Sequence, residues 1–410
     1  MSRRRVVVTG LGVVCPVGNT VDEAWQNIIA GRSGIAAIER FDATAFACRF
    51  AGEVKGFDVA AYLPAKEARH MDLFIHFGLA AGIQAWRDCG LEVGEANAHR
   101  IGVNIGSGIG GLPMIEQTHG DYVNKGPRRI SPFFVPASII NLISGHLSIM
   151  FGMKGPNLGV VTACTTGLHA IGLAGRLIER GDADVMVAGG AEAAISPLGV
   201  GGFAAARALS TRNDDPQGAS RPWDRGRDGF VLGEGAGAVV LEEYEQARAR
   251  GARIYCELAG FGMSADAYHM TAPNVDGPRR CMREALKDAR LDAERVQYVN
   301  AHGTSTPLGD KNETDAIKAA FGGHASSLVV SSTKSMTGHL LGGAGGIESV
   351  FTVLAIHHGV CPPTINLTDP DPECDLDYCA GGARDLRIEA AVKNNFGFGG
   401  TNGTLVFTKV

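Results

Sequence analysis

Residues 163–167 read Ala-Cys-Thr-Thr-Gly, and residues 334–338 read Lys-Ser-Met-Thr-Gly. Each stretch has the pattern of a strand that turns into a helix, and each is followed by a helix of small residues. The same kind of turn therefore occurs twice in the chain. This repetition predicts that the protein is built from two related halves.

The repetition continues on the N-terminal side of both turns, in the same order. Residues 8–12 resemble residues 258–262, and residues 101–105 resemble residues 296–300. No proline-rich linker, charge block or low-complexity tract separates the halves, so we expect them to pack closely against each other. We place the halves at residues 1–250 and 251–410.

Apolar strands alternate with helical stretches along the whole chain. Residues 185–188 have the pattern of a strand, and residues 165–180 and 278–290 have the pattern of helices. This alternation is typical of mostly parallel sheets in an α/β protein with doubly wound halves. The first of these helices is rich in glycine and poor in charge, so we expect it to be buried. Residues 107–155 have no counterpart of equal length in the second half, and we interpret them as an insertion that carries a substrate channel and subunit contacts.

Composition excludes several classes of protein. The net charge of −5 gives no basic field for nucleic acid. No apolar run approaches the roughly 18 residues of a membrane span, and the glycines that follow Val6-Val7-Val8 favour a first strand over an export signal. The nine cysteines are scattered without a CxxC pair, which argues against a zinc site or a disulfide framework and favours the cytoplasm.

Cys164 is a candidate nucleophile. A cysteine at the start of a helix lies near free backbone N–H groups and the positive end of the helix dipole. Both effects are expected to lower the pKa of the thiol, and the N–H groups offer donors for an oxyanion. A lone cysteine is more often an inert buried side chain, so this motif alone leaves both interpretations open.

Two histidines occur in similar turns. His302 lies in Asn-Ala-His-Gly-Thr-Ser-Thr-Pro (residues 300–307), and His339 ends the stretch 331–339 just before a glycine-rich helix. Either histidine alone is more often structural than catalytic. One cysteine and two histidines at the ends of three strands, each among glycines and hydroxyl side chains, indicate a shared site.

Other chemistries do not fit the spacing. His302 and His339 lack metal-ligand spacing and have no acidic partner close in sequence. Residues 10–12 lack the third glycine of a dinucleotide fingerprint, and no P-loop is present. We therefore expect neither a metal nor a cofactor, and we interpret His357 and His358 as structural.

Together, the motifs around these residues resemble the Cys-His-His condensing enzymes of the thiolase fold, the β-ketoacyl-[acyl carrier protein] synthases. The matching stretches are TACTTG (162–167), NAHGTSTPLGD (300–310), SSTKSMTGHLLGGAG (331–345) and NFGFGGTN (395–402). Further stretches are similar to the bacterial synthase II branch: GSGIGG (106–111), ISPFFVPASIINLISGH (130–146), GVGGF (199–203) and RPWDRGRDGFVLGEGAG (221–237). The resemblance covers nearly the whole chain and implies an αβαβα layered, thiolase-like fold.

This resemblance implies a role for each motif. Cys164 would take the growing acyl group from acyl carrier protein as a thioester. His302 and His339 would each donate a hydrogen bond to the enolate that forms when malonyl carrier protein loses CO2, and Lys334 would organise the histidine pair electrostatically. The backbone N–H groups of Cys164 and Phe398 would form the oxyanion hole. The implied activity is elongation of medium to long fatty acyl chains.

The resemblance also implies where the substrate binds. Thr304 and Thr306 match contacts to the phosphopantetheine arm, and Phe398 matches a gate at the reacting centre. Ile109 lies between glycines, where a small residue would open a long acyl pocket and a bulky one would restrict it. The residues expected to line that pocket are Ile109, Phe134 and Phe203.

Glu348 matches a carboxylate that supports the site from behind. In some relatives such a carboxylate would help to hold an ion, together with side chains corresponding to Asn300, Asn394 and Asn395. Carboxamide-rich turns are more often simply hydrogen-bonded to backbone, so we expect no bound metal.

The implied partners are acyl carrier protein and a second copy of the chain. The apolar stretch Phe133-Phe134-Val135-Pro136 in the insertion suits an isologous contact, which predicts a homodimer. His70 stands where we expect a lysine in close relatives, so the basic patch for the acidic carrier is weaker or pH-sensitive there. The residues expected to form this patch are Lys66, Arg69, Arg128 and Arg129.

Three alternatives share the fold. A polyketide-type ketosynthase would use the same chemistry on another acyl chain. A non-catalytic partner subunit would lack the nucleophile, and Cys164 argues against it. A thiolase would carry a second catalytic cysteine near the C-terminus, where this chain has Phe396-Gly397-Phe398-Gly399.

Overall fold

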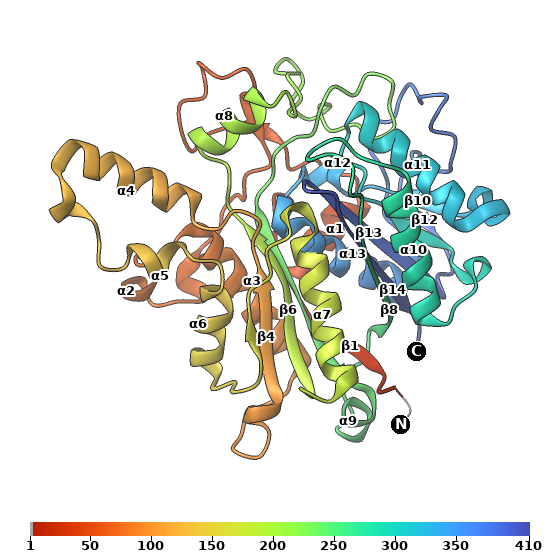
Figure 1. Ribbon diagram of the computed structural model, residues 1–410, viewed down its shortest axis with the longest axis horizontal. Helices are drawn as coiled ribbons and strands as arrows, with labels where there is room; N and C mark the ends of the chain where they lie inside the picture. Colours follow the sequence, from red (N-terminus) through yellow and green to blue (C-terminus); the bar gives the residue numbers. More distant parts are fainter. Residues whose placement is uncertain (1–2) are drawn as a thin grey trace.

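The computed structural model describes residues 3–410, and its centre is a ten-stranded sheet (Figure 1). The strands fall into two sets along the chain. The first set is β1 (Val6–Val14), β4 (Ile101–Gly106), β5 (Asn157–Leu158), β6 (Val185–Glu192) and β7 (Gly235–Glu243), in the spatial order β5-β4-β6-β7-β1. The second set is β8 (Cys256–Ala265), β9 (Tyr298–Asn300), β10 (Val329–Ser331), β13 (Ala390–Gly397) and β14 (Thr401–Thr408), in the spatial order β10-β9-β13-β14-β8.

The two sets have the same topology. In the first, β4 runs parallel to β5 and β6, and β7 runs antiparallel to β6 and β1. In the second, β9 runs parallel to β10 and β13, and β14 runs antiparallel to β13 and β8. The sets meet where Val7 and Val8 pair with Glu257 and Cys256. The internal repetition of the sequence therefore corresponds to a repeated strand order.

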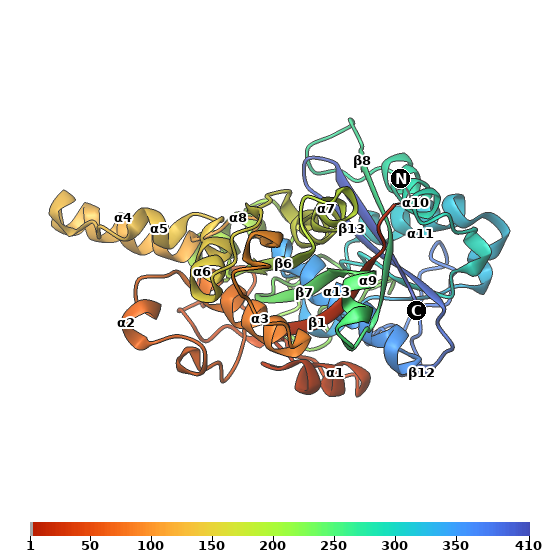
Figure 2. The same ribbon diagram turned by 90° about the horizontal axis from the view of Figure 1, so that it is seen from below.

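Four long helices complete the layers: α3 (Leu73–Cys89), α7 (Thr166–Arg180), α10 (Asp276–Ala289) and α13 (Ala344–His358). Helices α7 and α13 pack against each other in the middle, while α3 covers β1, β6 and β7 and α10 covers β8 and β14. In Figure 2, α3 and α7 lie on opposite sides of β6 and β7. The five layers are α3, the first strand set, α7 with α13, the second strand set and α10. This is the αβαβα architecture expected from the resemblance.

The glycines of the two central helices permit their close approach. A Cβ added to Gly167 would lie 2.6 Å from the backbone nitrogen of Gly346, and one added to Gly345 would lie 2.3 Å from that of Leu168. No larger residue fits at these positions without moving backbone. Helix α7 is largely buried, which confirms the expectation from its composition.

The remaining elements are short or peripheral. The predicted division at residues 250 and 251 falls between α9 and β8 and stays a prediction. The insertion at 107–155 contains α4, α5 and α6, and α4 projects from the body of the molecule (Figure 1). The bounds are α1 (Val21–Ile29), α2 (Ala65–Ala68), α4 (Leu112–Lys125), α5 (Phe134–Ser138), α6 (Leu142–Phe151), α8 (Pro197–Ala205), α9 (Tyr244–Ala249), α11 (Pro307–Phe321), α12 (Lys334–Thr337), β2 (Ala36–Ala37), β3 (Phe50–Ala51), β11 (Val360–Cys361) and β12 (Arg384–Asp385).

Candidate active site

Four segments that are distant in sequence meet at one cavity of about 380 Å³. Cys164 lies in the turn that leads into α7, and His302 follows β9. His339 lies between α12 and α13, and Phe398 follows β13. All four residues line the cavity. The structure therefore brings together the cysteine and both histidines that the sequence analysis selected.

The turn before Cys164 holds its backbone in an uncommon conformation. Ala163 has a φ of 49°, and Leu341 has the same value in the turn that leads into α13. The structure therefore pairs residues 163–165 with residues 341–343 and not with residues 334–338, because that stretch forms the separate short helix α12. Non-glycine residues rarely adopt this left-handed region, and such residues cluster at functional sites. The conformation places Cys164 at the start of α7, where its side chain reaches the cavity.

The expected lowering of the Cys164 pKa is not found. Burial raises the pKa of the thiol to about 11, although the Lys334 ammonium and the backbone N–H groups of Phe398 and Cys164 act in the opposite direction. Desolvation of a thiolate outweighs these favourable interactions. The resting cysteine is therefore a neutral thiol whose backbone surroundings favour its anion.

Both histidines are fixed in the same tautomer. The Nδ1 atom of His302 lies 3.3 Å from the Nδ2 donor of Asn395, and the Nδ1 atom of His339 accepts a hydrogen bond of 3.3 Å from the N–H of Leu341. An accepting Nδ1 places the proton of a neutral imidazole on Nε2. The two rings are 5.2 Å apart and nearly perpendicular.

The histidines are also held neutral. Burial lowers the pKa of His302 and of His339 well below the ordinary value, and the positive charge of Lys334 lowers both further. Each ring therefore offers one Nε2–H donor at neutral pH. Two neutral donors at one cavity suit the oxygen of an enolate.

A layer of buried charges lies behind the histidines. The Lys334 Nζ atom donates to the carbonyl oxygen of His302 at 2.7 Å and lies 2.5 Å from Glu348 Oε1. Lys393 lies 2.8 Å from Glu348 Oε2. Burial alone would raise the pKa of Glu348, but the two ammonium groups hold it below its ordinary value. Lys334 and Glu348 thus lie directly behind His302, and their roles stay predictions.

Two of the candidate ion ligands, Glu348 and Asn394, already have protein partners. Both oxygens of Glu348 already contact ammonium groups, and the Oδ1 atom of Asn394 accepts from Thr404 on the opposite face of β13. Within residues 3–410, no three His, Cys, Asp or Glu side chains cluster in a way that suits a metal ion.

Three buried charged residues of this site were not selected from the sequence. Lys393 is one of them. Glu313 accepts the backbone N–H groups of His302 and Gly303 at 2.8 and 2.7 Å. Glu192, at the end of β6, accepts from Gly108 and Gly342 at 2.8 and 3.0 Å. The glutamates thereby fix loops from both halves around the cavity.

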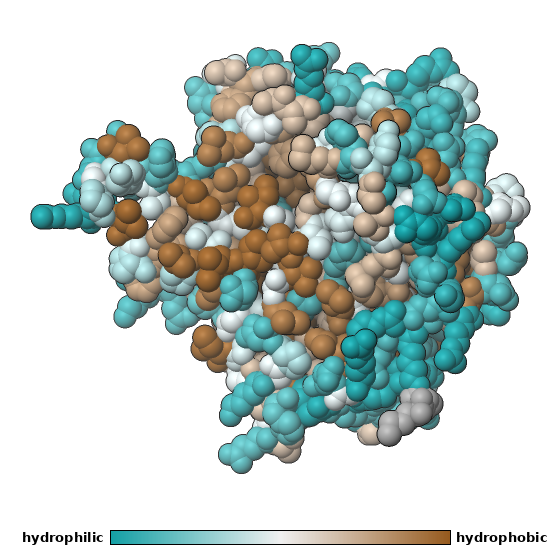
Figure 3. All heavy atoms as spheres, viewed as in Figure 1, coloured by the Kyte–Doolittle hydropathy of each residue, from teal (hydrophilic) through white to brown (hydrophobic). Residues whose placement is uncertain are grey.

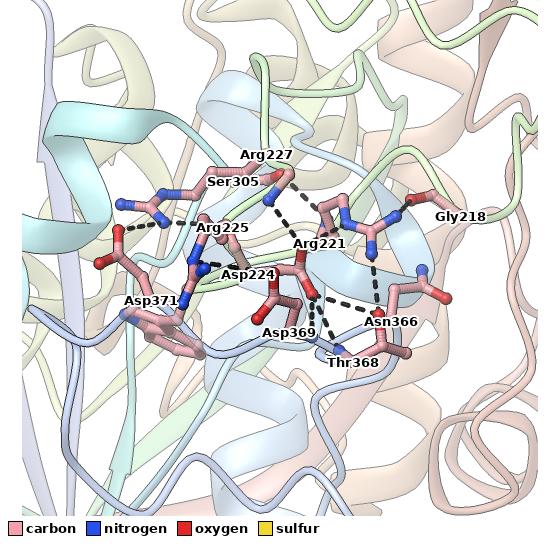
Figure 4. Close-up of polar contacts among 12 residues, drawn as sticks. Gly218, Arg221, Asp224, Arg225, Arg227, Ser305, Asn366, Thr368, Asp369 and Asp371 are labelled. Atoms are coloured by element: carbon pink, nitrogen blue, oxygen red, sulfur yellow. Dashed lines mark hydrogen bonds and ion pairs between the residues drawn. The ribbon is translucent and has the colours of Figure 1, made fainter.

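The arginine-rich loop before β7 braces the loop that follows β9 (Figure 4). The backbone N–H of Arg221 donates to the Ser305 hydroxyl at 2.9 Å. The guanidinium of Arg227 donates to the Thr306 carbonyl at 3.2 Å and pairs with Asp371 at 2.8 Å. These contacts explain why the motif at 221–237 accompanies the histidine motifs.

The substrate residues divide into two groups. Thr304, Thr306 and Phe203 line the cavity, and the two threonine hydroxyls are 3.0 Å apart. Ile109 and Phe134 are not among its lining residues. The Ile109 side chain is 39% exposed on the face that carries the insertion. Their assignment to an acyl pocket stays a prediction that requires this face to be covered.

The four predicted patch residues are exposed. Lys66 and Arg69 belong to the region of α2, and Arg128 and Arg129 follow α4. The two segments are connected where His70 stacks on Phe133, with ring centroids 3.9 Å apart. A further exposed cation, Arg207, lies at the cavity itself and was not among the residues predicted from the sequence.

Comparison with known proteins gives consistent matches. The family described as "Beta-ketoacyl synthase, N-terminal domain" matches residues 3–247, and "Beta-ketoacyl synthase, C-terminal domain" matches residues 255–368. The chain is 60% identical over 413 residues to "3-oxoacyl-[acyl-carrier-protein] synthase 2" of Vibrio harveyi and 58% identical over 412 residues to the protein of that name from Coxiella burnetii, covering 100% of both chains in each case.

Solved structures also match over nearly the whole chain. A β-ketoacyl synthase from Burkholderia phymatum gives a TM-score of 0.93 at 38% identity, covering 99% of this chain and 100% of the other. A chain of the AntDE:AntF assembly, described as a type II PKS acyl carrier protein in complex with its ketosynthase, gives a TM-score of 0.92 at 37% identity, with full coverage of both chains. Within residues 3–410, every helix is too short or too polar to cross a membrane.

Proposed function

Because this chain belongs to the β-ketoacyl synthase family, we propose that its cavity catalyses a decarboxylating condensation in which Cys164 carries the growing acyl group. The enzyme is a condensing acyltransferase of fatty acid elongation. Its substrates are acyl and malonyl groups carried by acyl carrier protein, and its products are 3-oxoacyl carrier protein, CO2 and free carrier.

In the first half-reaction, Cys164 attacks the thioester carbonyl of acyl carrier protein. The negative charge that develops on the carbonyl oxygen is stabilised by the backbone N–H groups of Cys164 and Phe398. The carbon–sulfur bond to the carrier then breaks, and the thiol proton leaves on the carrier sulfur. The result is an acyl thioester on Cys164 and a free carrier.

In the second half-reaction, malonyl carrier protein places its thioester oxygen against the Nε2–H groups of His302 and His339. The bond to the carboxylate carbon breaks, CO2 leaves, and the electron pair remains as an enolate that the two donors stabilise. The enolate carbon attacks the acyl carbon, and the bond to the Cys164 sulfur breaks. The sulfur leaves as a thiolate and takes a proton from solvent, which restores the neutral thiol. Such a sequence is ping-pong.

The observation that carries this proposal is the pair of neutral imidazoles with matching tautomers at the cavity of Cys164. The test is a single turnover with an acylated enzyme and malonyl carrier protein labelled in its free carboxyl group. Equal amounts of labelled CO2 and 3-oxoacyl carrier support the proposal. Acyl transfer to coenzyme A without release of CO2 contradicts it and favours a thiolase.

The identity of 60% to a 3-oxoacyl-[acyl-carrier-protein] synthase 2, against 37% to a chain of the polyketide ketosynthase assembly, supports fatty acyl groups as the substrate.

The predicted acyl pocket depends on Ile109. We predict that Ile109→Phe lowers condensation of donors of twelve carbons by about tenfold or more relative to donors of about six, because a close-packed pocket cannot absorb the added volume. Rates are measured for a series of acyl carriers, with Ile109→Ala as the matched variant. Equal slowing of all donors would place the pocket elsewhere.

We propose a C2 homodimer formed through the insertion. In Figure 3, apolar side chains form a band that runs from the base of α4 past α5 and α6 toward α7, and a patch of this kind suits an interface between copies. The short strand β5 lies at the edge of the sheet beside it. The most exposed apolar residues of this region are Val123, Val135, Ile149 and Val161.

We predict that Val135→Glu converts the dimer to monomers and lowers elongation of long acyl chains, because a buried, unpaired carboxylate is costly at an interface. Light scattering with size exclusion measures the mass of each variant. Val410→Glu, which adds the same charge at a similarly exposed residue outside the patch, is the matched control. A wild-type enzyme that is active as a stable monomer contradicts the dimer.

We further propose that the basic patch steers the acidic carrier to the cavity. Arg207 lies at that cavity and extends the patch formed by Lys66, Arg69, Arg128 and Arg129.

All nine cysteines are free thiols. This supports a reducing compartment, the cytoplasm, as the site of action.

A further inference from the structure

Lys393 is a buried lysine that contacts no solvent. Its side chain is 0% exposed, although lysines are almost never fully buried unless they are paired. Its ammonium lies 2.8 Å from Glu348 Oε2 and also donates to the carbonyl oxygen of Asn394. Side chains alternate along a strand, so Lys393 and Asn395 of β13 face α13 together. A lysine held in this way has a specific structural or electrostatic role.

The contacts of Lys393 lead to one of the catalytic histidines. Glu348 Oε2 accepts from Lys393 and also from the Nδ2 atom of Asn395 at 3.1 Å. The same Nδ2 group lies 3.3 Å from His302 Nδ1. Because the Asn395 amide donates to both acceptors, the position of Glu348 determines which way that amide points. Lys393 thus helps to keep the His302 proton on Nε2.

Lys393 adds positive charge to the buried charged residues around the histidines. Lys334 from α12 and Lys393 from β13 carry ammonium groups, and Glu348 from α13 and Glu313 from α11 carry carboxyl groups. All four side chains are buried. Removing one ammonium makes the surroundings of the imidazoles more negative. This change favours the protonated forms of the imidazoles.

We propose that Lys393 is a second positioning residue of the condensation, one that fixes Glu348 and Asn395 behind His302 and supplies the positive charge that keeps both imidazoles neutral. The inference rests on the proposed role of His302 and His339 as enolate donors. Lys393 itself does not line the cavity, so it acts through the histidines and not on the substrate.

The electrostatics of the cluster agree with this geometry. The positive charge of Lys393 is among the causes that lower the pKa of both His302 and His339, after burial and Lys334. Burial lowers the pKa of Lys393 to about 8, and the Glu348 carboxylate opposes that shift. The ammonium form of Lys393 is therefore present at neutral pH and below, which is the range in which the imidazoles must resist protonation.

The test measures CO2 release from malonyl carrier protein between pH 5 and 9 for wild type and for Lys393→Met, which keeps the shape of the side chain but removes its charge. We expect kcat to fall and its acid limb to move upward by about 1 to 2 pH units, because the histidines gain protons more easily. KM for malonyl carrier is expected to stay unchanged, since Lys393 does not contact substrate. Lys287→Met, on the exposed side of α10, is the control.

Lys393→Gln is the second variant, because its amide can still donate to Glu348 and preserve folding. The same upward movement of the acid limb in this variant supports the charge role of Lys393. Either variant, folded and with the acid limb of the wild type, overturns the proposal. If the wild-type enzyme itself releases no CO2, the failure lies in the proposed function and not in Lys393.

Discussion

Replacing Cys164 by alanine is expected to abolish both acyl transfer and condensation, with a loss of at least about 10⁴-fold. The thioester has no other acceptor in the cavity, because Cys164 is the only cysteine among its lining residues. Intact-mass measurement after mixing with acyl carrier protein should show an added acyl group on the wild type and none on the variant.

The matched control is Cys89→Ala, which removes another buried thiol at the end of α3. This variant should still gain the acyl group. Circular dichroism and thermal unfolding should show that Cys164→Ala keeps the fold, since removing a small side chain at the wall of a cavity leaves the surrounding contacts in place. An acyl label on a different residue of Cys164→Ala would contradict the assignment.

Replacing either histidine by alanine is expected to separate the two half-reactions. His302→Ala and His339→Ala should still accept an acyl group on Cys164, because the oxyanion donors of that step are backbone N–H groups. Release of CO2 should fall by about 10²- to 10³-fold in each variant, since each loses one preorganised enolate donor. The measurements are intact mass for acylation and labelled CO2 for decarboxylation.

His358→Ala, at the exposed end of α13, serves as the control for these variants. It should retain both half-reactions. A His302 or His339 variant that decarboxylates at the wild-type rate refutes the donor role of that residue. A variant that loses acylation as well would indicate that the histidine also supports the nucleophile.

The duplicated fold is visible in the sequence because the repeated signals are local. The strand patterns at 8–12 and 258–262 became β1 and β8, which hold equivalent positions in their sets. Helix α7 was expected to be buried because its glycines and lack of charge show this within a few residues. The projection of α4 from the body of the molecule was not predictable, because it depends on tertiary contacts that no local sequence pattern shows.

The proposed catalytic residues could be selected from the sequence because their signals are local, and their buried partners could not because their contacts are not. Cys164 and His302 lie in short, distinctive motifs. Lys393, by contrast, is a single charged residue in a strand, and nothing local shows that it meets Glu348 from a helix 45 residues earlier in the chain. The raised pKa of Cys164 was likewise not predictable, because burial of a thiol depends on tertiary packing.

The central claim is that two neutral imidazoles present Nε2–H donors to the cavity of Cys164. Neutron diffraction from perdeuterated crystals at pH 7 observes these protons directly. We expect one deuteron on Nε2 of His302 and one on Nε2 of His339, with no deuteron on either Nδ1 atom. A deuteron on Nδ1 of either ring, whether in a charged imidazolium or in the other neutral tautomer, would contradict it.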